Sequence, residues 1–143
     1  MTARFYLVRH AKAEGSAAGG DAARRLSDKG RRHFAELIGA LAGELELSRI
    51  VTSPFTRARE TAALLAEATG APVEVEPRLA SGASSGRELL ALGAALGPGA
   101  ALVGHNPELA AAVALAGGQG AEVPPGAVAA VRLDGRLDWL RVR

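Results

Sequence analysis

The chain has 143 residues, of which 48% are hydrophobic and only 3% aromatic, and its formal net charge is +2. This length is typical of one domain, and so much apolar content allows a full core, here built mainly from aliphatic side chains and alanine. Because cysteine is absent, disulfides, thiol nucleophiles and cysteine metal sites are excluded. The basic residues are dispersed without aromatic residues between them, which argues against a nucleic-acid partner. No apolar stretch approaches the roughly 18 residues of a membrane span, and no signal-peptide core is visible, so we expect a cytoplasmic protein without a membrane partner.

The first half of the chain alternates between apolar runs and helical patterns. We expect a strand at residues 4–9, a loop at 11–26, a helix that begins at Ser27 or Asp28, and a short strand at 49–52. Ser53-Pro54 has the form of an N-cap followed by proline in the first helical position, which predicts a helix over residues 54–69. Gly70 and Pro72 end that helix, and a short strand follows at residues 73–76.

The second half repeats this alternation and ends in a hairpin. A flexible segment at residues 81–86 precedes a helix at 87–96, a strand at 100–103, a helix at about 108–116 and a loop at 117–126. Strands at residues 127–133 and 137–142 flank Asp134-Gly135, a pair typical of hairpin turns. The whole pattern predicts one α/β domain over residues 1–143. We expect a three-layer sandwich with a mostly parallel central sheet, helices on both faces and an antiparallel hairpin at the C-terminal edge.

Two of the three histidines follow apolar strands directly: His10 comes after residues 4–9, and His105 comes after residues 100–103. Ligand sites in open α/β sheets form beyond the carboxyl ends of the strands, so the two imidazoles can meet there. Arg9 and Arg57 would join them, because Arg57 lies in the first turn of a helix that also follows a strand. Arginine forks bind phosphate oxygens, and a neutral imidazole can attack phosphorus, so the pattern favours phosphoryl chemistry.

Four segments in order resemble the histidine phosphatase superfamily, which has the phosphoglycerate mutase-like fold. They are Leu7-Val8-Arg9-His10-Ala11, Leu26-Ser27-Asp28-Lys29-Gly30, Ser53 to Thr61 and Val103-Gly104-His105-Asn106-Pro107. The short chain and the His-Asn-Pro segment make it most similar to the SixA-type phosphohistidine phosphatases. The resemblance implies that His10 is the nucleophile and is transiently phosphorylated. It also implies that Arg9, Arg57 and His105 bind the phosphoryl oxygens, with His105 counted among the catalytic residues.

No metal or other cofactor is expected, since arginines neutralise the phosphoryl charge and no metal-binding spacing occurs in the sequence. Many members of the superfamily also use a carboxyl group as general acid, in a segment that here corresponds to residues 79–84 and contains none. Glu14, Glu76 and Glu88 are the available substitutes. A P–N bond to a protonated imidazole breaks without much help from an acid, so this gap favours a phosphohistidine substrate carried by a protein partner.

Two other functions stay open at this point. The chain could be a general phosphatase of small phosphate esters, or a phosphoryl-binding module without catalysis. His33, the third histidine, lies beside Arg31 and Arg32 on a helix flank, where a solvated structural role is the simplest interpretation. Because the sequence offers little material for a lid, we expect a shallow and open site with the 11–26 loop at its rim.

Overall fold

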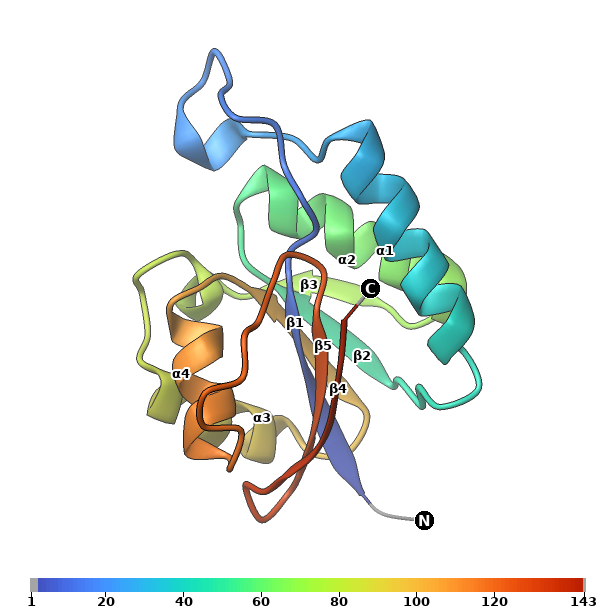
Figure 1. Cartoon of the computed structure of the whole chain (residues 1–143), viewed down its shortest axis with the longest axis vertical. Helices are drawn as coiled ribbons and strands as arrows, with labels where there is room; N and C mark the ends of the chain where they lie inside the picture. The colour runs from blue at the N-terminus through green and yellow to red at the C-terminus, as the bar shows by residue number, and fades with distance from the viewer. Residues whose placement is uncertain (1–2, 143) are drawn as a thin grey trace.

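The computed structural model describes residues 3–142, which form one six-stranded sheet with helices on both of its faces (Figure 1). The strands are β1 (Arg4–Arg9), β2 (Arg49–Thr52), β3 (Val73–Val75), β4 (Ala100–Gly104), β5 (Val128–Arg132) and β6 (Leu137–Arg141). The helices are α1 (Asp28–Leu41), α2 (Thr56–Thr69), α3 (Gly86–Leu96) and α4 (Glu108–Leu115), with single 3₁₀ turns η1 (Asp21–Ala23) and η2 (Pro77–Leu79). The α/β architecture predicted from the sequence is confirmed.

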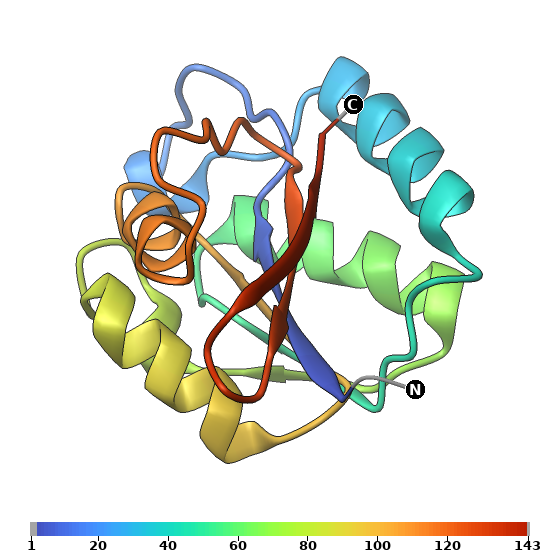
Figure 2. The ribbon, with the colours of Figure 1, turned by 60° about the horizontal axis from the view of Figure 1, so that its bottom comes forward.

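The strand order is β3-β2-β4-β1-β5-β6, and β1 lies at the centre of the sheet. β3, β2, β4 and β1 run parallel, whereas β5 pairs antiparallel with β1 and β6 pairs antiparallel with β5. The last two strands form the predicted hairpin at the sheet edge, which lies in front of the other strands in Figure 2. The expected mixture of a parallel centre and an antiparallel C-terminal edge is therefore present.

Alternating side chains of β1 serve two separate cores, as the period of a strand requires. Tyr6 and Val8 pack toward α1 and α2, while Phe5 and Leu7 pack toward α3 and α4. Helix α3 approaches the sheet closely at Gly93, where an added Cβ would lie 2.2 Å from the phenyl ring of Phe5. The central strand is thus buried on both faces, and its carboxyl end is fixed by packing on either side.

The start of the helix after β2 differs by two residues from the sequence expectation. α2 begins at Thr56, with Phe55 as its N-cap, rather than at Pro54. The Ser53 hydroxyl oxygen accepts the backbone N–H of Phe55 at 3.1 Å, so Ser53 organises the turn before the helix and not its first turn. None of the helices in residues 3–142 is long and apolar enough to cross a bilayer.

Candidate active site

The carboxyl ends of β1, β2 and β4 bring three sequence-distant segments together. In the sheet register Arg9 is opposite Gly104 and Thr52 is opposite Val103. His10, Ser53 and His105 therefore follow neighbouring strand ends, and the ring centroids of His10 and His105 are 5.2 Å apart. The two histidines that the sequence singled out do share one site.

His10 is held in a single neutral tautomer by two contacts. Its Nδ1 lies 2.8 Å from the Ala11 carbonyl oxygen, which only accepts hydrogen bonds, so Nδ1 carries the proton. The Nε of Arg57, which only donates, lies 3.4 Å from His10 Nε2. Burial lowers the pKa of His10 to about 4, and the positive charges of Arg57 and Arg9 add to this effect. At neutral pH the ring is uncharged, and its unprotonated Nε2 accepts the Arg57 N–H.

His105 is fixed by the β2 segment. Its Nε2 lies 2.7 Å from the Ser53 hydroxyl oxygen, and the Phe55 ring meets it edge-on with centroids 4.9 Å apart. The pKa of His105 falls to about 3, first because the ring is buried and then because His10 and Arg57 lie close. At neutral pH His105 is therefore a neutral ring that offers a hydrogen bond rather than a positive charge.

Arg57 lies in the first turn of α2 and contacts the 11–26 loop. Its Nη1 donates to the Asp21 backbone oxygen at 2.7 Å, and its Nη2 is 3.2 Å from Asp21 Oδ2. The guanidinium also lies over the Phe55 ring at 5.1 Å. Arg24 lies on the other side of the same carboxylate, with its Nη1 3.0 Å from Asp21 Oδ1. Asp21 is thus placed between two arginines at the edge of the site.

Arg9 emerges beside His10 and reaches the loop before β5, where its Nη1 donates to the Val123 carbonyl at 3.0 Å. Asn106 donates to the same carbonyl at 2.9 Å, which ties the two strand ends to one loop. Among residues 3–142, only Arg9 Nε and His105 Nδ1 are buried side-chain nitrogens or oxygens without a hydrogen-bond partner. Buried polar atoms are nearly always paired, so both mark places where a ligand atom would be accommodated.

The site is more closed than the sequence analysis expected. His10, Arg57 and His105 are 8%, 5% and 2% exposed. The loop between β1 and α1 is held at its base by a bridge from Ala13 to Leu26, and its Asp21 contacts Arg57. The sequence analysis expects this loop at an open rim, but the loop covers part of the site. This closure requires no inserted domain.

The carboxylates proposed as substitute acids are engaged elsewhere or exposed. Glu76 caps η2 and pairs with Arg78, which lowers its pKa. The Glu88 carboxylate accepts the Ser85 N–H in the capping box of α3, which also lowers its pKa. Glu14 is exposed on the first loop. Asp21 is the carboxylate in contact with Arg57, and sequence reasoning missed it because a loop-tip contact has no sequence pattern.

A buried carboxylate organises the segment that carries the acid in other members of the superfamily. Glu108, in the first turn of α4, accepts the Gly82 N–H at 2.9 Å and is largely buried. This bond attaches residues 80–84 to the helix that follows His105. Ser53, which sequence analysis assigned only as an N-cap, is the second side chain whose role at the site was missed.

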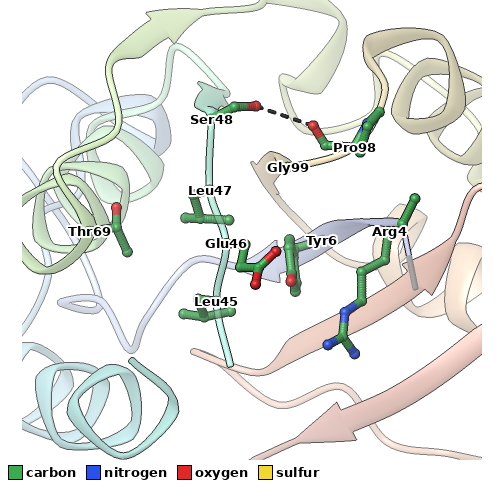
Figure 3. A pocket seen from close by; sticks show the side chains of 10 residues that line it. Arg4, Tyr6, Leu45, Glu46, Leu47, Ser48, Thr69, Pro98 and Gly99 are labelled. Atoms are coloured by element: carbon green, nitrogen blue, oxygen red, sulfur yellow. Dashed lines mark hydrogen bonds between the residues drawn. The ribbon is translucent and has the colours of Figure 1, made fainter. Parts of the chain in front are cut away.

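A hollow lies at the opposite end of the sheet (Figure 3). It measures about 540 Å³ and is lined by the amino end of β1, the segment before β2 and the turn before β4, including Arg4, Tyr6, Ser48 and Gly99. Ligand sites in this fold class form at the other ends of the strands. Arg4, the basic residue among the described residues that line this hollow, is paired with Asp138 at 2.6 Å. No group of three or more potential metal ligands occurs within residues 3–142.

Comparison with known proteins agrees with this geometry. The histidine phosphatase superfamily (branch 1) matches residues 5–87. A candidate SixA phosphohistidine phosphatase from Agrobacterium tumefaciens is 25% identical, with a TM-score of 0.86, and the match covers 100% of this chain and 99% of that one. A corresponding SixA candidate from Nakamurella multipartitia is 26% identical over 99% of this chain and 96% of that one, with a TM-score of 0.78.

The fold is also that of a protein histidine phosphatase SixA solved with tungstate, at 24% identity and a TM-score of 0.83, over 96% of this chain and 95% of that one. No curated protein sequence matches the chain. The family match spans more than half of the sequence and includes the segments that carry His10 and Arg57. This chain belongs to the histidine phosphatase superfamily, branch 1.

Proposed function

We propose that the chain is a metal-independent phosphohydrolase that works through a phosphohistidine intermediate on His10 and removes phosphate from phosphohistidine in a protein partner. The single observation that carries this proposal is the state of His10. Its proton is held on Nδ1 by the Ala11 carbonyl, and the electron pair on Nε2 lies beside the Arg57 guanidinium. A histidine nucleophile of phosphorus needs this combination of an unprotonated nitrogen and a neighbouring positive charge.

In the first step His10 Nε2 attacks the phosphorus of the substrate. A bond forms between Nε2 and phosphorus while the bond from phosphorus to the substrate's imidazole nitrogen breaks. The electron pair of the broken bond returns to that imidazole, which leaves as a neutral ring with its proton on the other nitrogen. In the second step water attacks phosphorus, and the bond from phosphorus to His10 breaks with its electron pair returning to Nε2. Inorganic phosphate leaves with both protons of the water, and His10 is again a neutral ring with its proton on Nδ1.

Charge on the phosphoryl oxygens is balanced by Arg57 and Arg9, with His105 as a neutral hydrogen-bonding partner. The buried Arg9 Nε and His105 Nδ1, which are unpaired among the described residues, support this assignment because a phosphoryl oxygen would satisfy them. Fixed donors around phosphorus supply much of the catalysis in phosphoryl transfer. The site therefore accounts for catalysis without a metal ion.

The choice of substrate is supported by what the carboxylates do. Arg24 and Arg57 hold the pKa of Asp21 below its usual value, so this carboxylate is ionised at neutral pH and has no proton to give. Glu76 and Glu88 are engaged in caps. An alkoxide leaving group needs a general acid, whereas a protonated phosphohistidine does not. Similarity to the two SixA candidates at 25% and 26% identity supports the same substrate class.

The test is a substrate panel with wild type, His10→Ala and His33→Ala. We expect an acid-labile phosphoenzyme in wild type and in His33→Ala, and its loss together with turnover in His10→Ala. A phosphohistidine phosphotransfer domain should be hydrolysed with higher kcat/KM than sugar phosphates or nucleotides. Preference for the small esters would indicate a general phosphatase, and phosphate binding without turnover would indicate a binding module. Loss of activity with a chelator and its recovery with a divalent ion would contradict the mechanism.

A further inference from the structure

Each of the three nitrogens of the Arg57 guanidinium has a partner within the chain. Its Nε faces His10 Nε2, its Nη2 faces the Asp21 carboxylate, and its Nη1 binds the Asp21 backbone oxygen. Nε and Nη2 form one edge of the rigid fork with which arginine binds phosphate in bidentate fashion. Asp21 contacts both Nη atoms, so its carboxylate lies beside the edge that a phosphoryl group requires and shares Nη2 with it.

The two ends of this edge differ chemically. The nucleophilic atom of His10 lies at the Nε end, and the Asp21 carboxylate lies at the Nη2 end. His10, Arg57 and His105 are 8%, 5% and 2% exposed, whereas the Asp21 side chain is 61% exposed. The part of a substrate that extends from the buried site toward solvent therefore passes the Asp21 carboxylate.

When its contact with Arg57 is lost, Asp21 stays ionised and keeps its hydrogen bond from Arg24. Its side chain is 61% exposed, its pKa is held low first by the hydrogen bond from Arg24, and that bond is 3.0 Å long. The stem of the loop is fixed separately, since Glu14 N–H donates to Arg25 O at 2.7 Å and Arg24 Nε donates to Glu14 O at 2.7 Å. The carboxylate therefore remains at the rim when a phosphoryl group takes its place on Arg57.

From this arrangement we infer that Asp21 is a specificity-determining residue that favours a cationic leaving group, the protonated imidazole of phosphohistidine, over phosphate esters that carry further negative charge. When the Asp21 carboxylate is displaced from Arg57, it accepts the imidazole N–H of such a substrate. This hydrogen bond keeps the imidazole protonated. In that form the P–N bond breaks readily, because its electron pair returns to the ring. An anionic ester must displace the same carboxylate and then meets its repulsion. This inference rests on the proposed function.

The experiment compares wild type, Asp21→Asn and Asp28→Asn. Asn has the shape of Asp without its charge, and Asp28 is an exposed carboxylate in the first turn of α1 that is no partner of Arg57 among the described residues. The measurements are kcat/KM on a phosphohistidine peptide and on phosphoglycerate, and the inhibition constant of inorganic phosphate. Urea unfolding of each variant establishes that the fold is retained.

In Asp21→Asn we expect kcat/KM to fall about fivefold on the phosphohistidine peptide and to rise about fivefold on phosphoglycerate, as for the loss of one partly exposed charge contact. Inorganic phosphate should inhibit this variant at lower concentration, while Asp28→Asn should resemble wild type. An equal change on both substrates, or unchanged inhibition by phosphate, would overturn the inference while the proposed function stands. If wild type does not hydrolyse the phosphohistidine peptide, the proposed function itself fails and the inference falls with it.

Discussion

The two buried histidines make the stability of the fold depend on pH in a range where most proteins are insensitive. Folding lowers the pKa of His10 from 6.5 to about 4 and that of His105 from 6.5 to about 3. Both rings are neutral in the folded state at pH 5, whereas in the unfolded chain they are almost fully protonated. The unfolded state binds more protons, so the free energy of unfolding falls as pH decreases from about 7 toward 4.

The size of this effect follows from proton linkage. At pH 5 each histidine favours the unfolded state by about 2 kcal/mol relative to high pH, so the pair costs about 4 kcal/mol. Typical domains have about 5–15 kcal/mol of stability, so this loss is a large part of the total. Carboxylates contribute little above pH 5, because their pKa values in the unfolded chain are near 4.

Urea unfolding at pH 7 and pH 5 measures the effect directly, on wild type, His10→Gln, His105→Gln and His33→Gln. Each site variant should lose about half of the pH dependence whatever its stability at pH 7, and His33→Gln should keep the part due to His10 and His105. NMR titration of the imidazole resonances gives the two pKa values independently. A wild-type change below about 1 kcal/mol, or the same pH dependence in all three variants, would refute the argument that burial keeps both rings neutral.

Three further predictions concern single contacts. Arg57→Lys keeps the positive charge but removes the bidentate fork, so kcat/KM should fall about tenfold or more while stability changes little, as steady-state kinetics and urea unfolding would measure. Ser53→Ala removes the partner of the buried His105 Nε2 and of the partly buried Phe55 N–H. Chemical denaturation should record a loss of about 1–3 kcal/mol together with reduced turnover, whereas unchanged turnover would mean that His105 does not need this hydroxyl. Gly93→Ala places a methyl group against the Phe5 ring and should cost about 1–3 kcal/mol, whereas Gly39→Ala, at an open position in α1, should be neutral or stabilising; equal thermal midpoints would contradict the close packing described above.

The sequence was sufficient to predict the helices, the strands and the meeting of the two histidines, because these depend on local patterns. Apolar runs that end in polar residues located the carboxyl ends of β1 and β4, and the parallel sheet brought His10 and His105 together there. The roles of these residues remain predictions. The pair Ser53-Pro54 is fully explained by an N-cap followed by proline, so the sequence assigns Ser53 no other role. Its bond to His105 depends on the pairing of β2 with β4, which no single segment specifies.

Asp21 lay beyond sequence reasoning for a different reason. It lies near the tip of a loop rich in alanine, glycine and serine, and such segments have no periodicity from which a contact can be predicted. Its approach to Arg57 is decided by the stem of the loop and by Arg24. The same contact explains why the site is covered rather than open, since the closure comes from a loop conformation and not from additional sequence.

The position of β1 in the sheet determines when the site can exist during synthesis. This first strand pairs with β4 and β5, which lie about a hundred residues later in the chain. Contacts of such long sequence separation form slowly. A growing chain that has not yet reached Ala100 already contains His10 and Arg57 but has no strand beside β1, so the proposed phosphate site can form only after β4 and β5 have been synthesised.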